Sequence, residues 1–271
     1  MKQKAIFLDL DGTLLNDARE ITEGNRQAIR QALEAGHKVV IATGRPLVSA
    51  LAQAKKLGLT EAGCYCIAFN GGMIYDMGAK SLIYREAVRP ELVQAVFAEA
   101  GRRQVHLQAY DDTFVLVPPQ HSDDYVNRYC SKVGMDYRVV SSVEEIGAGT
   151  CKMLGIDYVD RAPLQGLIDW VGANTNGELE AFFSCKEYIE IIPHGLGKGN
   201  AIRRLAGILG IPMEDTIAAG DEENDLTMIR EAGLGCAMAN AVPAVKAVAD
   251  YITKRDNNQD GIQEIIEAFM L

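Results

Sequence analysis

In the first third of the chain, strand-like apolar runs alternate with longer helix-like stretches. We predict strands at residues 4–10, 38–42 and 65–69, and helices at residues 22–35 and 46–57. Pro46 stands at a predicted helix start, and Gly36 and Gly58 follow predicted helix ends, which are the positions that these residues favour. Strands that alternate with long helices predict the α/β class, with a parallel sheet covered on both faces.

The rhythm changes after residue 72. Two strand-like runs at residues 73–75 and 81–84 predict a hairpin that leads away from the first sheet, with a boundary near Arg85. The next segment is predicted to contain helices at residues 90–102, 123–133 and 162–172, and strands at residues 105–110, 113–117, 151–157 and 179–184. This order predicts an inserted α+β domain with antiparallel character over residues 85–187.

The α/β alternation resumes at residue 188. Predicted here are strands at residues 188–192, 216–219, 235–238 and 250–253, and helices at residues 198–209 and 223–232. Since both ends of the chain show the same alternation, we predict that residues 1–84 and 188–271 build one core sheet together.

The composition narrows the classes of function. A length of 271 residues suggests about two domains, and 48% hydrophobic with 24% charged residues is ordinary for a globular protein. The net charge of -10 argues against a nucleic-acid or membrane-surface binder, because both partners select basic faces. A small phosphorylated metabolite stays possible, since a metal ion and a few basic side chains reverse the potential locally.

The cysteines and the apolar stretches bear on location. Cys64 and Cys66 have no second cluster with which to form a zinc site, so we predict reduced thiols. The apolar stretch at residues 232–249 is interrupted by polar residues and is too short to span a bilayer. The chain starts directly on a predicted strand, so we expect no signal peptide, a cytoplasmic location, and a monomer or homodimer.

Two carboxylates lie at the end of the first predicted strand. If strand alternation continues as the chain leaves the sheet, Asp9 and Asp11 project to the same side and share one small volume. Such a pair either raises the pKa of one carboxyl or recruits a cation. The residues leave open a second interpretation, an Asx turn with a helix cap, which Gly12 and Thr13 also suit.

Two further patches lie at predicted helix starts. Thr43-Gly44-Arg45 ends a strand, where a hydroxyl and free amides can hold phosphoryl oxygens, although a plain threonine cap fits equally well. Lys198 stands in a glycine-rich run at the start of a predicted helix. The run differs from a nucleotide-binding P-loop, because the lysine is followed by a glycine and Asn200 and not by the Ser or Thr that a P-loop requires. A solvated lysine is the alternative interpretation there.

The fourth patch follows the predicted strand at residues 216–219. Asp221 and, in the next turn, Asn224 and Asp225 offer hard oxygen ligands of the kind that Mg²⁺ prefers. Glu222 and Glu223 fit a different role, since acidic residues at a helix start are favoured by the helix dipole.

The run from residue 7 to residue 14, Phe-Leu-Asp-Leu-Asp-Gly-Thr-Leu, resembles the opening motif of the haloacid dehalogenase superfamily. That resemblance implies that Asp9 is a nucleophile and Asp11 a general acid and base. The chemistry agrees, because a carboxylate can attack phosphorus in line and a nearby carboxyl can protonate the leaving oxygen. The Thr-Gly-Arg patch resembles the Cof-type (subclass IIB) branch, which implies a Rossmann-like core with an inserted C2-type cap.

The resemblance also assigns roles to the other patches. Lys198 would neutralise charge on the transferred phosphoryl group, and Asn70-Gly71 resembles a turn beside the substrate, although it also suits an ordinary turn. The implied phosphate- and substrate-binding residues are Thr43, Gly44, Arg45, Asn70, Gly71, Lys198 and Asn224. The implied Mg²⁺ ligands are Asp9, Asp11, Asp221 and Asp225.

Leaving-group contacts are expected from the cap. The candidates there are Lys152, Lys186, Glu187, Tyr188 and His194. The resemblance as a whole implies a cytoplasmic, Mg²⁺-dependent phosphatase that hydrolyses small phosphate monoesters such as sugar phosphates through an aspartyl phosphate on Asp9. A phosphomutase, a receiver-like phosphate switch and a non-enzymatic metabolite sensor stay open as alternatives.

Overall fold

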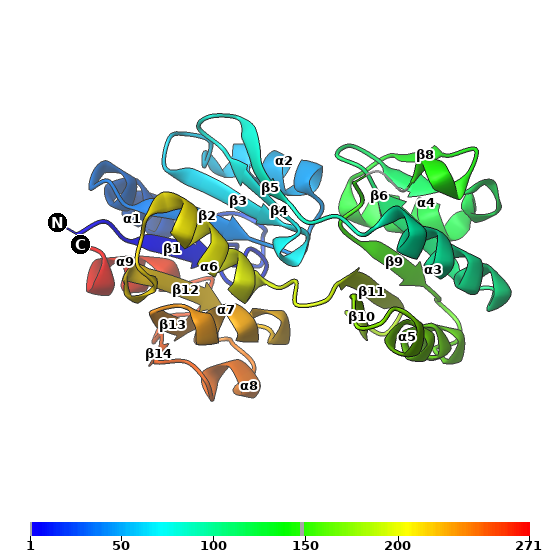
Figure 1. The fold of residues 1–271 in the computed structure, drawn as a ribbon. Coiled ribbons are helices and arrows are strands. Elements are labelled where there is room, and N and C mark those ends of the chain that lie inside the picture. Colours follow the sequence, from blue (N-terminus) through cyan, green and yellow to red (C-terminus); the bar gives the residue numbers. More distant parts are fainter. Residues whose placement is uncertain (1, 147–148) are drawn as a thin grey trace. The chain divides into compact units, whose positions relative to one another are not determined.

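The computed structural model describes residues 2–146 and 149–271, which form two compact units (Figure 1). The core unit comprises Met1–Arg45, Ala50–Tyr84 and Gly197–Leu271. The insert unit comprises Pro46–Ser49 and Arg85–Leu196. None of the helices in the described ranges combines the length and hydropathy needed to cross a membrane.

The core unit is built on an eight-stranded sheet in the order β14-β13-β12-β1-β2-β3-β4-β5. Its strands are β1 (Ala5–Leu8), β2 (Lys38–Ala42), β3 (Cys64–Ala68), β4 (Met73–Asp76), β5 (Ser81–Arg85), β12 (Thr216–Gly220), β13 (Leu234–Ala237) and β14 (Tyr251–Ile252). Neighbours from β14 to β3 pair in parallel, and β1 at the centre is fully buried. Both faces of a central parallel strand are covered, which explains why the sequence of β1 is apolar throughout.

Helices cover both faces of this sheet, which confirms the predicted α/β class (Figure 1). They are α1 (Glu23–Glu34), α2 (Leu47–Leu57), α6 (Lys198–Leu209), α7 (Leu226–Glu231), α8 (Pro243–Lys246) and α9 (Gly261–Phe269), with short 3-10 turns η1 (Phe69–Gly71), η4 (Met213–Asp215) and η5 (Glu223–Asp225). On one face α1 packs beside α9, and on the other α6 packs beside α7. The helix α9 was not predicted from the sequence.

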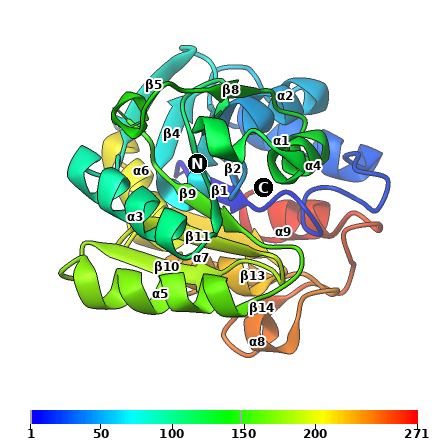
Figure 2. The ribbon, with the colours of Figure 1, turned by 90° about the vertical axis from the view of Figure 1, so that its right-hand side faces the viewer.

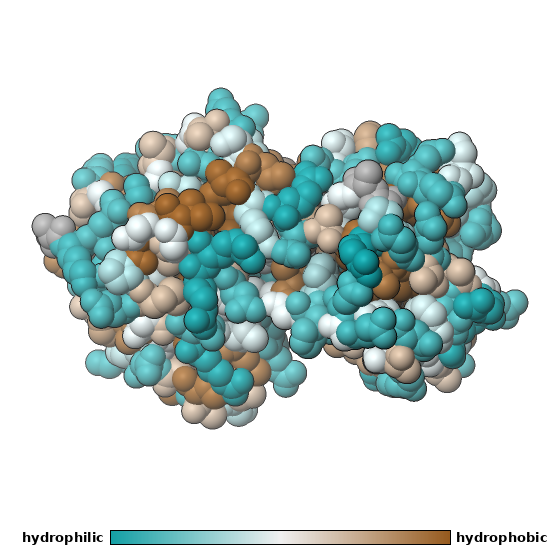
Figure 3. Space-filling view, viewed as in Figure 1, coloured by the Kyte–Doolittle hydropathy of each residue, from teal (hydrophilic) through white to brown (hydrophobic). Residues whose placement is uncertain are grey.

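The hairpin after β3 differs from its prediction. The strands β4 and β5 do not lead away from the sheet but extend it, and β4 pairs antiparallel with β3. At this edge the Arg204 guanidinium stacks on the Tyr84 ring at 3.8 Å from its centre. Apolar surface lies around the hairpin and α6 in Figure 3, where Leu82 and Ile208 are exposed. The charged side chain of Arg204 limits this apolar surface at the sheet edge.

The insert unit is a second, separate sheet in the order β10-β11-β9-β6-β7-β8. Its strands are β6 (His106–Tyr110), β7 (Val115–Val117), β8 (Tyr137–Val139), β9 (Met153–Ile156), β10 (Leu179–Phe183) and β11 (Tyr188–Pro193). Its helices are α3 (Pro90–Arg102), α4 (Asp124–Val133) and α5 (Ala162–Asn174), with 3-10 turns η2 (Pro119–His121) and η3 (Val143–Glu145). Most of the pairing is antiparallel.

The two faces of the insert sheet differ in chemistry. Leu107, Met153 and Ile189 on one face join the apolar side chains of α3 and α5 in the unit's buried core. α4 lies over the opposite face (Figure 2). This face carries both polar and apolar side chains, and the Tyr110 hydroxyl there donates to that of Tyr129 on α4. Alternation along the strands therefore separates the buried core face from a mixed face.

The strand at residues 188–192 was predicted for the core sheet, and this prediction was wrong. The structure pairs β11 with β9 and β10 in the insert sheet. The pattern of alternating isoleucines identifies a strand but does not identify its partner. Glu190 on this strand forms an ion pair with Lys152 at 3.2 Å, which is a contact within the insert unit. The return to the core therefore falls near Gly197 rather than at residue 188.

Candidate active site

Four of the predicted patches follow adjacent strands of the core sheet. Asp221 follows β12, Asp9 follows β1, Thr43 follows β2 and Asn70 lies in η1 after β3. Since these strands are parallel neighbours, their carboxyl ends lie at one edge of the sheet. In open α/β sheets, ligands usually bind at this edge, in the crevice that forms where the strand order reverses.

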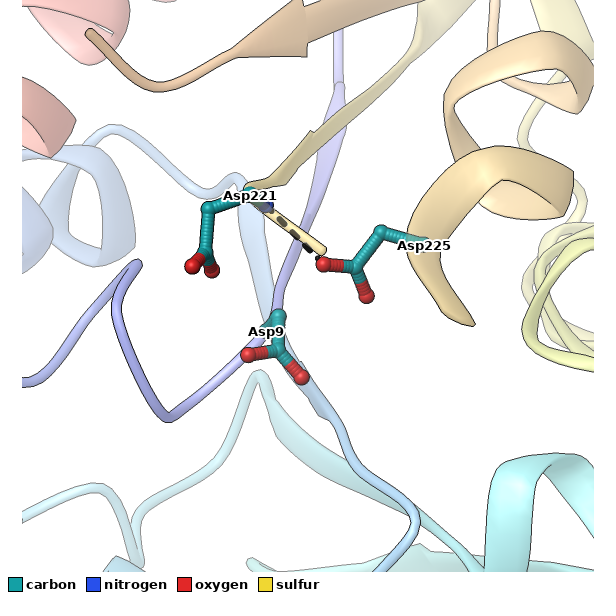
Figure 4. Close-up of side chains that lie close together, drawn as sticks. All are labelled: Asp9, Asp221 and Asp225. Atoms are coloured by element: carbon teal, nitrogen blue, oxygen red, sulfur yellow. Dashed lines mark hydrogen bonds between the residues drawn. The ribbon is translucent and has the colours of Figure 1, made fainter. Parts of the chain in front are cut away.

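Three carboxylates meet at this edge. One oxygen from each of Asp9, Asp221 and Asp225 lies within 4.8 Å of the others, and Figure 4 shows the side chains converging. Asp225 comes from η5, where its carboxylate accepts hydrogen bonds from the backbone amides of Asp221 (2.9 Å) and Glu222 (3.1 Å). The turn after β12 is therefore folded around the Asp225 side chain.

Lys198, at the first position of α6, lies in the middle of the cluster with no exposed surface. Its ammonium donates to Asp9 Oδ1 at 2.5 Å and to Asp225 Oδ1 at 2.6 Å. The turn after β3 allows the run before Lys198 to come this close, because a Cβ at Gly71 would lie 2.8 Å from the carbonyl oxygen of Gly197. Gly71 also has a φ of +111°, which favours glycine.

The cluster carries more negative than positive charge. Burial raises the pKa of Asp9 to about 7, although Lys198 opposes the shift. Burial likewise raises the pKa of Asp221 to about 6, with Asp225 adding to the effect. The pKa of Lys198 lies above its ordinary value, because the charges of Asp9 and Asp225 outweigh the effect of burial. Three buried carboxylates beside one ammonium therefore favour binding of a further cation.

Thr13 is a site residue that sequence reasoning treated only as part of a turn. Its hydroxyl is buried and donates to Asp221 Oδ1 at 2.7 Å. Gly12 brings the turn this close, because it has a φ of +81° and a Cβ there would lie 2.3 Å from Asp221 Oδ2. The signal for this residue in the sequence was a hydroxyl side chain four residues after Asp9 and directly after a glycine.

The second patch contacts the turn after β3. The Thr43 carbonyl accepts from the Asn70 amide at 3.0 Å, and a Cβ at Gly44 would lie 2.9 Å from Asn70 Oδ1. The buried Thr43 hydroxyl accepts from the Arg45 amide at 3.2 Å. The structure therefore brings the Thr-Gly and Asn-Gly patches together, next to the run that carries Lys198. Asn224 lies on η5 with its side chain exposed.

Asp11 is placed differently from the prediction. Strand alternation does not extend to it, because β1 ends at Leu8, and its carboxylate instead forms an ion pair with Arg45. The guanidinium donates at 2.6 Å and 2.7 Å, and the Asp11 side chain is 57% exposed. The metal-capable cluster in the described residues therefore consists of Asp9, Asp221 and Asp225 without Asp11.

The five insert candidates do not form one group. Lys152 is buried and paired with Glu190, while the Tyr188 hydroxyl lies 3.1 Å from that of Tyr158. Lys186 is exposed, and His194 faces Glu180 at 3.7 Å. The carboxylate of Glu187, the remaining candidate, accepts from the Cys185 thiol.

The donor set of the acidic cluster fits Mg²⁺. The oxygens of Asp225 are engaged by Lys198 and by two backbone amides. Among the described residues, Oδ2 of Asp9 and Oδ2 of Asp221 accept no hydrogen bond. Mg²⁺ usually takes one or two carboxylates and keeps several waters, which matches two oxygens left for a cation in a partly buried site.

Known proteins share this fold. The family described as haloacid dehalogenase-like hydrolase matches residues 6–266. The 5-amino-6-(5-phospho-D-ribitylamino)uracil phosphatase YcsE of Bacillus subtilis is 32% identical over 268 residues, covering 99% of this chain and 96% of the relative. A solved haloacid dehalogenase-like hydrolase from Bacteroides thetaiotaomicron has a TM-score of 0.87 at 32% identity, covering 98% of this chain and 99% of that one.

A further solved structure narrows the branch. It is a subclass IIB sugar phosphatase, BT4131, with a TM-score of 0.78 at 25% identity, covering 98% of this chain and 99% of that one. The chain belongs to the haloacid dehalogenase-like hydrolase family. Within that family it is a phosphatase of the Cof type, acting on small phosphorylated substrates, and the resemblance drawn from the sequence is confirmed.

Proposed function

We propose that the protein hydrolyses small phosphate monoesters, sugar phosphates among them, with Mg²⁺ and through a phosphoryl group carried on Asp9. The contact of buried Asp9 with Lys198 at the carboxyl end of the parallel sheet is the main support. A carboxylate fixed in this way is oriented for attack, and the ammonium beside it attracts a phosphoryl group. The lysine would also stabilise the negative charge that develops on the transferred phosphoryl oxygens.

The proposed reaction has two displacements. A carboxylate oxygen of Asp9 attacks phosphorus in line, an acyl phosphate forms, and the bond to the leaving oxygen breaks. Asp11 gives its proton to that oxygen, so that an alcohol departs. Water then attacks phosphorus, Asp11 takes a proton from the water, and the bond from Asp9 to phosphorus breaks. The products are inorganic phosphate and free Asp9.

Asp11 can reach both positions in this scheme because it is half-exposed. It would exchange its ion pair with Arg45 for the leaving oxygen by rotating about its own side-chain bonds. The hydroxyl of Thr43 would donate to a phosphoryl oxygen, and the bond from the Asn70 backbone amide to the Thr43 carbonyl would keep that hydroxyl in place.

The Mg²⁺ would be held by the free oxygens of Asp9 and Asp221, with Asp225 behind them. When bound, the ion neutralises the excess negative charge of the site and polarises the phosphoryl group. Thr13 and Lys198 would keep the two ligand side chains oriented, since each donates to the oxygen that the ion does not need.

The similar proteins support the substrate class. One is named as a sugar phosphatase and another as a phosphatase of a phosphorylated ribityl compound. The substrates in these names share a phosphate ester on a small polyhydroxylated group. We therefore expect the preferred leaving groups of this protein to be small and rich in hydroxyls.

Phosphate release from p-nitrophenyl phosphate and from a panel of sugar phosphates, measured with Mg²⁺ or with EDTA, tests the proposal. We expect turnover with Mg²⁺, loss of turnover with EDTA, and recovery with excess Mg²⁺. A folded, Mg²⁺-binding protein that releases no phosphate from any ester would contradict hydrolysis, and product analysis would then show whether it moves phosphate between positions of a sugar.

Replacing Gly12 by alanine is expected to weaken Mg²⁺ binding, because the new Cβ would displace the Asp221 carboxylate. We expect the Mg²⁺ concentration for half-maximal activity to rise by about 10–100-fold, the effect typical of disturbed ligand orientation. Gly36→Ala is the matched control, since Gly36 has a similar φ of +85° but no neighbour within 4 Å of its Cβ position. It shares the backbone strain of about 1–2 kcal/mol without the clash. Equal Mg²⁺ dependence in both variants would contradict the prediction.

A further inference from the structure

The turn that carries Asp11 has a glycine at its centre. Gly12 is required there because of its positive φ and because a side chain would collide with Asp221. Backbone hydrogen bonds close the ends of the turn, but glycine itself has the widest backbone freedom of any residue. The Asp11 side chain is half-exposed and is held by its ion pair with Arg45. Once that ion pair is exchanged for the leaving oxygen, as proposed above, the position of Asp11 depends on what holds the Gly12 peptide.

One restraint comes from a distant part of the chain. The Asn240 side chain, in the loop after β13, donates from Nδ2 to the Gly12 carbonyl oxygen at 2.8 Å. Thr13 holds the opposite side of the turn through its bond to Asp221. The turn is thus held by a hydrogen bond on each side of the Gly12 peptide. Of the two partners, Asp221 belongs to the acidic cluster and Asn240 does not.

Asn240 is itself held in place. Its Oδ1 accepts from the Asn257 backbone amide at 3.2 Å, and Asn257 Nδ2 donates to the Leu15 carbonyl at 2.9 Å. Asn257 is 4% exposed, so water does not readily replace its bond to Leu15, while Asn240 lies at the surface. Together Asn240 and Asn257 form an asparagine clamp, in which two side-chain amides from the C-terminal segment bind two carbonyls of the turn.

We propose that Asn240 is a positioning residue for proton transfer by Asp11, acting through the Gly12 peptide. This inference rests on the proposed function, in which Asp11 protonates the leaving oxygen. Without the Asn240 bond the Gly12 carbonyl loses its side-chain partner, and the position of the carboxyl that precedes it becomes more variable. A displacement of about 1 Å in a catalytic group can lower a rate by about 100-fold. Asp9 is less affected, because Lys198 holds it directly.

The choice of leaving group separates this role from a structural one. An alkyl alcohol, as in a sugar phosphate, needs a proton to depart, whereas p-nitrophenolate leaves without one. The first displacement is therefore measured by itself, as the release of the leaving group in a single turnover, because the second displacement uses Asp11 as a base for both substrates. We expect Asn240→Ala and Asn240→Asp to lower this rate for the sugar phosphate by about 10–100-fold. For p-nitrophenyl phosphate we expect the rate of release to stay within about 2-fold, because p-nitrophenolate departs without a proton. Asn240→Asp is nearly isosteric and keeps the acceptor for Asn257, but it replaces the donor to Gly12 by a charged acceptor that repels the Gly12 carbonyl.

Two controls accompany these variants. Asn16→Ala removes a side-chain amide from the same segment, whose oxygen accepts only from Glu20 within its own turn, and should leave both substrates unaffected. In the single-turnover release of the leaving group, Asp11→Asn should show the same dependence on leaving group as the Asn240 variants, in a larger form. If Asp11→Asn shows that dependence and the Asn240 variants do not, or if the Asn240 variants slow the release of both leaving groups equally, the clamp inference is overturned. If Asp11→Asn slows the release of both leaving groups equally, the proposed role of Asp11 as the acid fails, and the inference fails with it.

Discussion

Replacing Asp9 by asparagine is expected to lower phosphate release by more than about 10⁴-fold, since the amide is no nucleophile towards phosphorus. The fold should survive. Asparagine has the size of aspartate, and Lys198 keeps Asp225 as an ionic partner at 2.6 Å. The loss should appear in kcat for every substrate, including p-nitrophenyl phosphate, because the nucleophile is required whatever the leaving group.

The matched control for Asp9→Asn is Asp215→Asn. Asp215 is another buried carboxylate of the core unit, and it pairs with Lys2 at 2.8 Å, away from the acidic cluster. Its variant loses a buried charge of the same kind and should keep full turnover. Circular dichroism melting verifies the fold of both. A folded Asp9→Asn protein that turns over at the parental rate would remove Asp9 from the nucleophile role.

The sequence was sufficient for the location of the site because the site depends on strand ends. Strand patterning predicted β2 at residues 38–42, as observed, and put Asp9 and Asp221 at strand ends. Once the strands are parallel neighbours, these residues must meet. The helix that begins at Lys198 was also predicted, but the place of Lys198 in the site came from the family resemblance and not from the strand pattern.

Features set by backbone geometry or distant partners were not accessible from the sequence. Asp11 lies beyond the end of β1, where alternation no longer applies, and turns to Arg45. The partner of β11 is chosen by long-range pairing, which local pattern does not encode. The helix α9 follows a polar loop and begins at Gly261, a poor helix former, so its start carried no signal. Asn240 acts on Gly12 across 228 positions of sequence.

The Lys198→Met variant is expected to lose activity and also stability. Removing the ammonium leaves Asp9 and Asp225 buried without their shared cation, and breaking a buried ion pair on one side costs about 3–5 kcal/mol. We expect the free energy of unfolding in EDTA to fall by about this amount at pH 8. Mg²⁺ should recover part of it, because an ion that binds only the folded state stabilises that state.

The deficit should depend on pH with a defined sign. With Lys198 present, burial already raises the pKa of Asp9 to about 7, and removal of the ammonium moves that pKa further upward. A carboxyl whose pKa is raised on folding favours the folded state at low pH and loses that contribution as the pH rises through the folded-state value. The variant should therefore be closest to the parent near pH 5 and furthest from it near pH 8.

Lys152→Met separates this effect from the loss of any buried lysine. Lys152 is 2% exposed and pairs with Glu190 in the insert unit, so its removal also takes a cation away from a buried carboxylate. Chemical denaturation of both variants, with Mg²⁺ and with EDTA, should show a loss of stability in each but recovery by Mg²⁺ only in Lys198→Met. Recovery of both by Mg²⁺, or of neither, would mean that the ion does not take over the charge that Lys198 balances in the acidic cluster.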